Sequence, residues 1–396
     1  MTTMAIDNKD KKVLNVPPLR FPEFSGEWKC TTIGNIGDIK NGPFGSVLHA
    51  EDYVENGIPI VTTEHFKTGL MPSDKFGIPQ VSNEDYIRLK GYRLETNDIV
   101  FSRVGSVDIN AHVGIEQNGW LFSGRVLRVR PKYDIDSLFL HYALSTEAVK
   151  RDIRNRAVGQ TMPSINTPIL SSTTIQLPKD LFEQKKVAHF LRLLDERIIT
   201  QNKIIEDLKK LKSAISLKML HSDSWEQFKI QDIASIGRGR VISSVEISQQ
   251  ENPLYPVYSS QTSNDGIMGY LDDFMFEGEY ISWTTDGANA GTVFYRNGKF
   301  NCTNVCGLLK LKKGFDAHFV SLVLAEATRM YVSTNLANPK LMNNTMGNIQ
   351  IRLPKLEEQK RISVVFRKLH GLLETHNSLI IKYSKQKQYL LSQMFI

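Results

Sequence analysis

Polar side chains that can hydrogen-bond to base edges and phosphates gather in short stretches of this 396-residue chain. Ser, Thr, Asn, Gln and Arg dominate these stretches, and such side chains make most of the protein contacts to nucleic-acid backbones and bases. The stretches are 41–49, 62–69, 102–112, 237–240, 259–266 and 284–291. Arg103, Arg238 and Arg240 are the strongest candidates, because arginine on guanine is the commonest specific contact. The other candidates are Lys67, Ser102, Asn110, His112, Gln160, Ser260, Gln261, Thr285 and Asn289.

Turns are built from the same residue types, so one such stretch alone favours an ordinary turn over a binding site. The repetition of these stretches at matching places in two halves of the chain favours recognition instead.

The chain contains one pattern twice. Residues 177–186 read LPKDLFEQKK and residues 353–361 read LPKLEEQKR, while GEWKCTTIGNIGDIKNG (26–42) is echoed by DSWEQFKIQDIASIGRG (223–239). Trp28 and Trp225 lie 197 positions apart, whereas Gln184 and Gln359 lie 175 apart, so the first globular segment is longer by about twenty residues. A unit used twice in one chain predicts a two-fold object. Two-fold objects that grip a linear polymer are often readers of DNA half-sites.

A long periodic helix follows each LP motif. Apolar residues recur with alternating spacings of four and three, which is typical of the a and d positions of a coiled coil. The polar interruptions also match, Gln201 with His376 and Lys212 with Lys387. The predicted seam consists of Val187, Leu191, Leu194, Ile198, Ile205, Leu208, Ile215 and Met219 in the first helix and Ile362, Phe366, Leu369, Leu373, Ile380, Tyr383, Leu390 and Met394 in the second.

The two seams match, so we expect the helices to pack against each other. A duplication favours the antiparallel arrangement, because an antiparallel pair has a local two-fold axis. Pro178 and Pro354 fix the helix starts, and Asp180 with Glu183 has the spacing of a capping box. His376 could act as a pH switch, but a polar residue that sets the register is the preferred interpretation.

Both globular segments show strand patterns between Gly, Asn and Asp turns. The predicted strands are 58–63, 98–104, 112–116 and 124–131 in the first segment and 255–260, 279–285, 291–297 and 305–312 in the second. One short helix is expected to close each segment, at 137–153 and 317–333. The fold class is therefore α+β: two β-rich globular domains separated by two long helices that form an antiparallel coiled coil, with a pseudo-two-fold internal repeat.

The net charge of +7 is unevenly distributed. Residues 28–178 are neutral, residues 221–354 carry −2, and the helical segments 179–220 and 355–396 carry +4 and +5. Overall basicity is thus weak support for nucleic-acid binding by the globular parts. If these parts contact DNA, either they use local basic loops or something else supplies much of the phosphate contact.

Neither metal chemistry nor membrane insertion is indicated. Cys302 and Cys306 have no nearby His or Cys to complete a zinc site, so we expect them to be small buried residues. No apolar run approaches the length of a membrane helix. Residues 1–27 have no apolar stretch typical of a signal peptide, and we expect a flexible lead-in. The cysteine usage indicates a reducing compartment and a cytoplasmic protein.

Several phrases resemble the specificity subunit of type I restriction–modification systems, and the similarity spans nearly the whole chain. They are NVPPLRFPEFSGEW (15–28), the two helix starts, DIVFSRVGS (98–106), GQTMPSIN (159–166) and YPVYSSQTSNDGIMGYLDD (255–273). The resemblance implies that 28–178 and 221–354 are target recognition domains, each reading one half of a split DNA sequence. It implies that the helices 179–220 and 355–396 are spacers that dock two methyltransferase subunits.

The resemblance also implies what the complex does. The methyltransferase subunits would bring S-adenosylmethionine and methylate adenine N6 in double-stranded DNA, and added motor–nuclease subunits would cleave it. This chain would bind no cofactor and no metal. It has no [DN]-P-P-[FYW] motif for a flipped adenine, no glycine-rich cofactor loop and no phosphate loop. We therefore expect no catalytic residue in it.

Two alternatives remain open: the recognition part of a fused restriction–methylation enzyme, and a non-catalytic coiled-coil adaptor that does not touch DNA. For a specificity subunit, the coil would act as a ruler between half-sites centred about one helical turn, roughly 34 Å, apart. We expect two different half-sites of three or four base pairs, about the reach of one small reading module, separated by unspecified bases.

Overall fold

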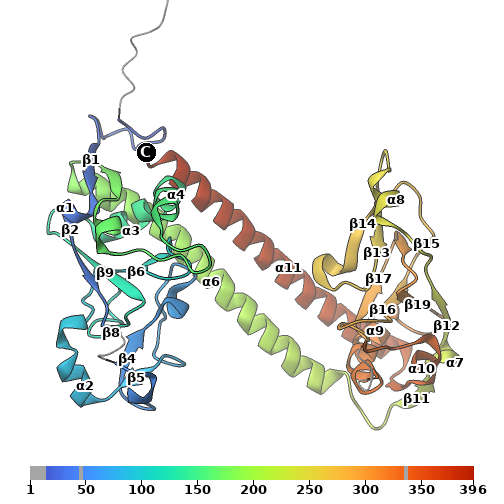
Figure 1. Ribbon diagram of the computed structural model, residues 1–396. Coiled ribbons are helices and arrows are strands. Elements are labelled where there is room, and N and C mark those ends of the chain that lie inside the picture. Colours follow the sequence, from blue (N-terminus) through green and yellow to red (C-terminus); the bar gives the residue numbers. More distant parts are fainter. Residues whose placement is uncertain (1–14, 44–47, 334–337) are drawn as a thin grey trace, which may run out of the picture. The chain divides into compact units, whose positions relative to one another are not determined.

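The computed structural model describes residues 15–43, 48–333 and 338–396. The chain divides into two compact units, Met1–Gln201 with Leu379–Ile396 (unit 1) and Asn202–Ser378 (unit 2). Both long helices contribute to both units (Figure 1).

Unit 1 is built on two four-stranded sheets, in the orders β2-β9-β6-β7 and β3-β5-β4-β8, and a separate antiparallel pair of β1 with β10. Its strands are β1 (Lys29–Thr32), β2 (Gly37–Asn41), β3 (Tyr53–Val54), β4 (Ile58–Val61), β5 (Gln80–Val81), β6 (Ile99–Ser102), β7 (Asn110–His112), β8 (Leu121–Phe122), β9 (Val126–Pro131) and β10 (Thr174–Leu177). Its short helices are α1 (Ile33–Ile36), α2 (Asn83–Arg88), α3 (Ser137–Leu144), α4 (Glu147–Arg156) and α5 (Thr167–Ser171), with 3-10 turns η1 (Ala50–Asp52), η2 (Thr63–Phe66) and η3 (Lys90–Tyr92).

Unit 2 repeats this plan, with sheets in the orders β12-β19-β16-β17 and β14-β13-β18-β15 and a pair of β11 with β20. Its strands are β11 (Glu226–Lys229), β12 (Ala234–Arg238), β13 (Tyr255–Tyr258), β14 (Ile267–Leu271), β15 (Phe276–Glu277), β16 (Tyr280–Thr284), β17 (Val293–Arg296), β18 (Lys299–Cys302), β19 (Cys306–Leu311) and β20 (Gln350–Leu353). Its short helices are α7 (Ile230–Ile233), α8 (Ser244–Ser248), α9 (Ala317–Ala327) and α10 (Asn343–Asn348), with 3-10 turns η4 (Ser263–Gly266) and η5 (Thr328–Met330).

The central strands form because their sequences are continuous β-branched and aromatic runs that can be covered on both faces. Ile99, Val100 and Phe101 of β6 are fully buried. A parallel contact joins the second sheet in each unit, β4 with β8 and β13 with β18. The predicted strands are confirmed within a few residues, except for 112–116, where β7 ends at His112.

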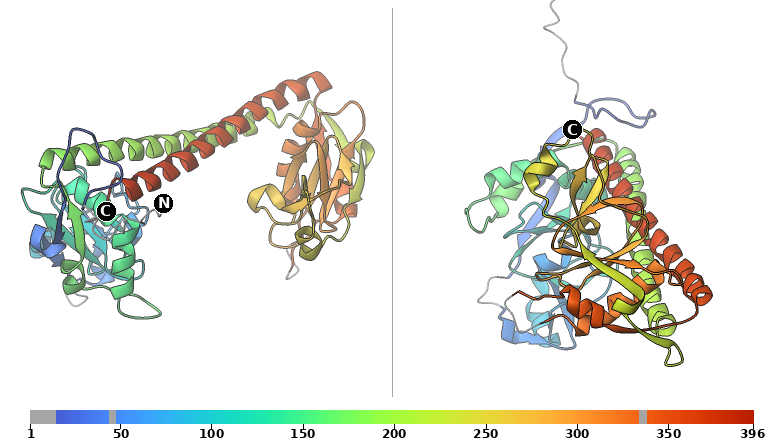
Figure 2. Two further views of the ribbon diagram at one scale, coloured as in Figure 1. Left: turned by 90° about the horizontal axis from the view of Figure 1, so that it is seen from above. Right: turned by 90° about the vertical axis from the view of Figure 1, so that its right-hand side faces the viewer.

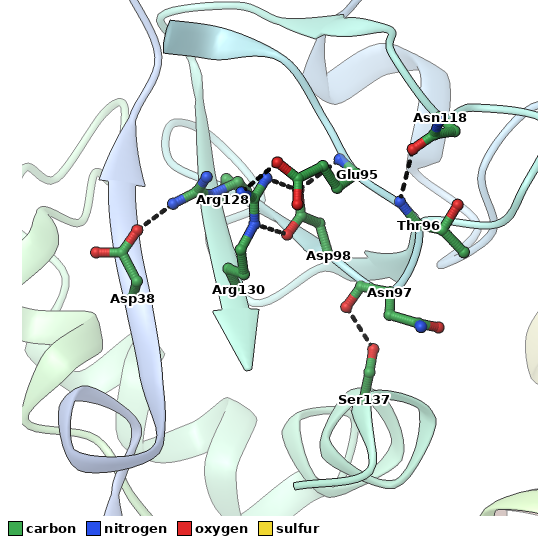
Figure 3. A network of polar contacts seen from close by, with 9 residues as sticks. All are labelled: Asp38, Glu95, Thr96, Asn97, Asp98, Asn118, Arg128, Arg130 and Ser137. Carbon is green, nitrogen blue, oxygen red and sulfur yellow. Dashed lines mark hydrogen bonds and ion pairs between the residues drawn. The ribbon is translucent and has the colours of Figure 1, made fainter. Parts of the chain in front are cut away.

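A polar network fixes the start of β6 (Figure 3). Arg130 of β9 makes paired hydrogen bonds of 2.7 and 2.8 Å to the carboxylate of Asp98, which is 1% exposed. The Arg130 Nη1 atom also donates to Glu95 at 2.6 Å, and these acceptors raise the pKa of the Arg130 guanidinium. The network holds the turn before β6 and so fixes where β6 begins.

The long helices are α6 (Leu181–Met219) and α11 (Leu356–Gln393). In unit 1, Leu390 of α11 and Met394 just beyond it share a core with Val187 and Leu191 of α6. In unit 2, Ile362 and Phe366 share a core with Leu220 just beyond α6. The start of each helix therefore packs near the end of the other, and the predicted antiparallel pairing is confirmed within each unit (Figure 2).

Every predicted seam position is buried or half-buried. One polar interruption has a clear role in unit 1. Lys387 donates to Asp195 at 2.6 Å, and the hydroxyl of Tyr142 donates to the same carboxylate at 2.7 Å. Burial and the adjacent carboxylate raise the pKa of Tyr142. A buried ion pair of this kind permits one alignment of the helices and disfavours a shifted one.

The repeated glutamine of the helix-start motif ties each long helix to its globular part. Gln184 accepts from the backbone N–H of Asp136 at 2.9 Å and donates to the carbonyl of Pro178 at 3.1 Å. Gln359 does the same with Asp316 (3.0 Å) and Pro354 (2.8 Å). Both glutamines are 1% exposed.

Three sequence-based expectations were wrong. Residues 15–27 are not a flexible lead-in, because they are bonded to the long helices. Arg20 donates to the Glu183 carboxylate, and the backbone N–H of Leu19 donates to the carbonyl of Gln393. Residues 1–14 lie outside the described residues. Glu183 binds Arg20 instead of completing a capping box, although Asp180 does cap the helix through Phe182 N–H at 2.8 Å.

The third error concerns the closing helices. The expected helix 137–153 is two helices, α3 and α4, and the expected helix 317–333 ends as α9 followed by η5. In the first case, the hydroxyls of Ser145 and Thr146 donate to the carbonyls of His141 and Ala143, at 2.8 and 2.9 Å. Such local bonds compete with helix continuation.

Two other observations complete the fold. Cys302 and Cys306 are buried, as predicted, and the Cys302 Sγ atom lies 3.5 Å from the carbonyl oxygen of Cys306. Within residues 15–43, 48–333 and 338–396, no helix has the length and apolarity needed to cross a membrane.

Candidate nucleic-acid interface

Four loops of unit 1 converge where β2, β6 and β9 meet. We call residues 41–43, 102–107, 123–125 and 157–166 loop cluster 1. Three backbone hydrogen bonds join it: Arg103 N–H to Arg125 O (2.9 Å), Gly105 N–H to Pro163 O (2.8 Å) and Ile165 N–H to Arg103 O (2.9 Å). The remainder of the predicted stretch 41–49 includes residues 44–47, which lie outside the described residues.

Four loops of unit 2 form the equivalent arrangement. We call residues 238–241, 284–291, 303–305 and 338–343 loop cluster 2. Its backbone bonds match those of loop cluster 1 one for one: Thr285 N–H to Val305 O (3.1 Å), Gly287 N–H to Pro339 O (3.0 Å) and Leu341 N–H to Thr285 O (2.9 Å).

In each cluster the backbone also approaches a glycine too closely for any other residue. A Cβ atom on Gly42 would lie 1.9 Å from Ser123 O, and one on Gly239 would lie 1.6 Å from Cys302 O. Since backbone atoms and glycines build both clusters, the exposed side chains can differ without loss of the framework.

The structure places Ser102, Arg103 and Gln160 in loop cluster 1. Arg103 is half-buried, and its Nη1 donates to Gly124 O at 3.0 Å, which fixes the guanidinium at the loop surface. Gln160 is exposed. Ser102 is 2% exposed and its hydroxyl points to Val104 O at 3.4 Å, so this side chain serves the loop itself.

Loop cluster 2 contains Arg238, Arg240, Thr285 and Asn289. Arg238 is half-buried and donates to Asn343 Oδ1 at 2.8 Å. Arg240 is exposed and paired with Glu246, whose carboxyl pKa it lowers through their hydrogen bonds. Asn289 is exposed, whereas Thr285 is fully buried and donates to Val305 O at 3.0 Å.

The remaining candidates lie outside the clusters. Asn110 is buried in a cluster with Ser145 (3.2 Å) and with the His141 ring, which lies 2.6 Å from Asn110 Oδ1, so its amide joins β7 to α3. His112 is half-buried; burial lowers its pKa, and within the described residues its Nε2 has no hydrogen-bond partner. Lys67 is exposed and paired with Glu64.

Ser260 and Gln261 lie in the half-buried loop after β13. Gln261 donates to the carbonyl of Ile267, the first residue of β14.

Sequence reasoning missed three exposed residues that the fold brings into the clusters: Arg125, Asn304 and Asn338. Arg125 and Asn304 occupy the short turn before β9 and β19, and only the strand pairing shows that these turns adjoin the other loops. All the candidate DNA contacts remain predictions.

The outward faces of the long helices carry several exposed apolar side chains. Unit 1 exposes Phe182 (65%), Leu193 (42%), Ile199 (47%) and Tyr389 (61%), and unit 2 exposes Leu211 (48%), Leu217 (77%), Val364 (51%) and Leu372 (46%). These positions lie outside the predicted seam.

Comparison with known proteins gives a consistent result. The model of the family described as "Type I restriction modification DNA specificity domain" matches residues 25–210 and 222–382. The chain is 41% identical over 177 residues to the type I restriction enzyme MpnII specificity subunit of Mycoplasma pneumoniae, covering 43% of this chain and 53% of that protein. Another Mycoplasma pneumoniae relative, also described as a type I specificity subunit, is 41% identical over 177 residues, or 43% of this chain and 73% of the relative.

The fold has close counterparts among solved structures. A crystal structure of a type I restriction–modification S subunit from M. genitalium superposes with a TM-score of 0.70 at 17% identity, over 96% of this chain and 99% of that one. A structure concerned with complex assembly of a type I system superposes with a TM-score of 0.53 at 14% identity, over 95% and 99%.

Proposed function

The chain belongs to the type I restriction modification DNA specificity family, and we propose that it is the sequence-reading, non-catalytic subunit of such a system. Unit 1 reads one half of a bipartite target and unit 2 reads the other. The observation that carries this proposal is the matched construction of loop clusters 1 and 2, in which identical backbone bonds present different exposed side chains.

The exposed or half-buried candidates in the clusters are the preferred contacts: Arg103, Arg125 and Gln160 in unit 1, and Arg238, Arg240 and Asn289 in unit 2. The Arg103 side chain is already held by the Gly124 carbonyl, so it loses less conformational entropy on binding DNA than a freely rotating arginine would. Ser102, Asn110 and Thr285 are buried and hydrogen-bonded, and we assign them to loop support.

The helices act as spacer and docking surface. We propose that the exposed apolar side chains of α6 and α11 bind two methyltransferase subunits, because burial of these side chains against a partner would stabilise the complex. Those subunits bind S-adenosylmethionine, methylate adenine N6 in double-stranded DNA in the cytoplasm and supply much of the phosphate contact. Motor–nuclease subunits add cleavage.

Replacement of one recognition domain tests the proposal that each unit reads its own half-site. Residues 28–178 are replaced by the corresponding part of a relative, and methylated adenines are mapped in a host that carries the methyltransferase. One half-site should change while the other stays the same. A change in both halves contradicts the assignment.

Removal of one heptad from α6, with the matching heptad of α11, tests the ruler. The gap between half-sites should change, or assembly should fail. An unchanged gap with full methylation refutes the spacer role.

Two assays separate the alternatives. The purified chain with labelled S-adenosylmethionine and DNA should transfer no methyl group; transfer would identify a fused enzyme. The complex should bind its target with strong salt dependence; absence of sequence-specific binding would favour a protein adaptor.

A further inference from the structure

The start of α6 in unit 1 is covered by an arginine-bearing segment. Arg20 places its guanidinium on the Glu183 carboxylate with paired bonds of 2.7 and 2.8 Å, and Trp28 Nε1 donates to the same carboxylate at 3.1 Å. Glu183 is therefore only 2% exposed. Arg20 also donates to the carbonyl of Gly26 at 2.6 Å.

Aromatic rings flank this arginine. Phe21 packs edge-on against Phe190 at 5.9 Å, and Phe24 packs against Phe182 at 6.0 Å. The segment thus combines one guanidinium with two phenyl rings, and its receptor combines a carboxylate with Trp28 and apolar surface.

Unit 2 contains the receptor without the segment. Glu358 and Trp225 are the counterparts of Glu183 and Trp28 in the repeat. The chain reaches Trp225 six residues after α6 ends at Met219, so it has no room for a covering segment. Glu358 is consequently 42% exposed, and its nearest cation, Arg361, is 3.9 Å away.

A hollow of about 480 Å³ opens at this place. Trp225, Phe228, Phe315 and Glu358 line it, and Gln359 forms its floor next to Pro354. Phe228 and Phe315 form an edge-to-face pair at 5.3 Å. Its two carboxylates, Glu226 and Glu358, outnumber its one lysine, Lys355, so the lining carries a net negative charge.

We propose that this hollow, the Glu358 pocket, binds a segment of another protein chain that carries an arginine beside aromatic residues. The guanidinium pairs with Glu358, and the aromatic side chains pack against Trp225 and the Phe228–Phe315 pair. The chain's own residues 15–27 are not the occupant, because Arg20 and Asn15 are already bonded into unit 1.

The probe is a fluorescent peptide with the sequence of residues 17–26, PPLRFPEFSG, titrated against the full chain by anisotropy. Arg20→Ala removes the guanidinium that would pair with the Glu358 carboxylate, so this substitution in the peptide should weaken binding by about tenfold or more. Glu358→Gln in the chain should have the same effect. Since Glu358 is a partly exposed surface residue, this variant should fold normally.

Control variants locate the site. Glu251→Gln, an exposed carboxylate elsewhere in unit 2, should leave peptide affinity unchanged. Glu183→Gln should also leave it unchanged, because that position belongs to unit 1. A second variant, Trp225→Phe, should weaken binding and alter the fluorescence change on binding.

Three outcomes overturn the proposal: no binding up to about 1 mM peptide, binding insensitive to Glu358→Gln, or binding sensitive to Glu183→Gln alone. The last outcome would mean that the peptide displaces the chain's own segment in unit 1. None of these outcomes bears on DNA reading, which the half-site mapping tests separately.

Discussion

Replacement of Gln184 or Gln359 by methionine should loosen the joint between a long helix and its globular part. Methionine has a similar length and fills the same space, but it can neither donate nor accept the two bonds that each glutamine makes. Because Gln184 joins α6 to the start of α3 and Gln359 joins α11 to the start of α9, each substitution should affect its own unit.

The magnitude follows from the groups that lose their partners. The carbonyl of Pro178 is buried and would be left without its amide donor, which costs about 1–3 kcal/mol. The N–H of Asp136 is partly exposed and water can replace some of the bond, so its loss costs about 1 kcal/mol. The sum is about 2–4 kcal/mol for Gln184→Met, and the matching geometry predicts the same for Gln359→Met.

Thermal and urea unfolding of the full chain, followed by hydrogen exchange, would measure these losses unit by unit. Gln388→Met, an exposed glutamine on α11, is the control and should change stability by less than about 0.5 kcal/mol. If Gln184→Met behaves like the control, the glutamine is not a structural tie and the repeated motif needs another explanation. If it destabilises both units equally, the two joints are not independent.

The remaining predictions concern pH, the loop framework and the helix register. Burial lowers the pKa of His318 to about 4, so unit 2 should lose stability as the pH falls from about 6.5 towards 4. After allowance for solvent screening, the loss should be about 1 kcal/mol at pH 5. His318→Gln should reduce the dependence of unfolding free energy on pH, measured by urea unfolding at several pH values. Gly42→Ala would bring a Cβ within 1.9 Å of Ser123 O, and should cost about 2 kcal/mol and impair one half-site only, as methylation mapping would reveal. Lys387→Met leaves the nearly buried Asp195 carboxylate without its cation and should lower the free energy of unfolding by about 2 kcal/mol, measured with urea. Adding Asp195→Asn should recover part of this loss. If the losses from Lys387→Met and Asp195→Asn simply add in the double variant, the two side chains are not coupled.

The repetitive parts of the fold could be predicted from sequence because periodicity encodes them. The seam of α6 and α11 follows from apolar spacing, and β6 and β9 follow from unbroken runs of β-branched and aromatic residues. Matching motifs at the two helix starts also indicated that one plan is used twice. The function of the glutamine in that motif could not be predicted, because one of its two partners is a backbone N–H that lies 48 residues away in unit 1 and 43 residues away in unit 2.

The site was less predictable because turn residues and binding residues have the same chemistry. Arg103 and Gln160 were identified, but so were Asn110 and Thr285, whose side chains are buried and hydrogen-bonded to other parts of the protein. Arg125 was missed because nothing local distinguishes the turn before β9 from any other. The pairing of β6 with β9 and the bond from Arg103 N–H to the Arg125 carbonyl place it beside the other loops.

The core of unit 1 contains residues from the C-terminal end of the chain, and this affects when the unit can fold during translation. Leu390, Met394 and Phe395 pack with Trp28, Phe139 and Leu191, yet the ribosome makes them only after all of unit 2. At about 5–20 residues per second, the nascent chain would wait roughly 10–40 s between Leu194 and Leu390. During that interval, the first unit lacks three side chains of its core, so the apolar residues that they cover stay accessible to a chaperone or another nascent subunit. The order of translation thus makes the second unit the first that can close its core.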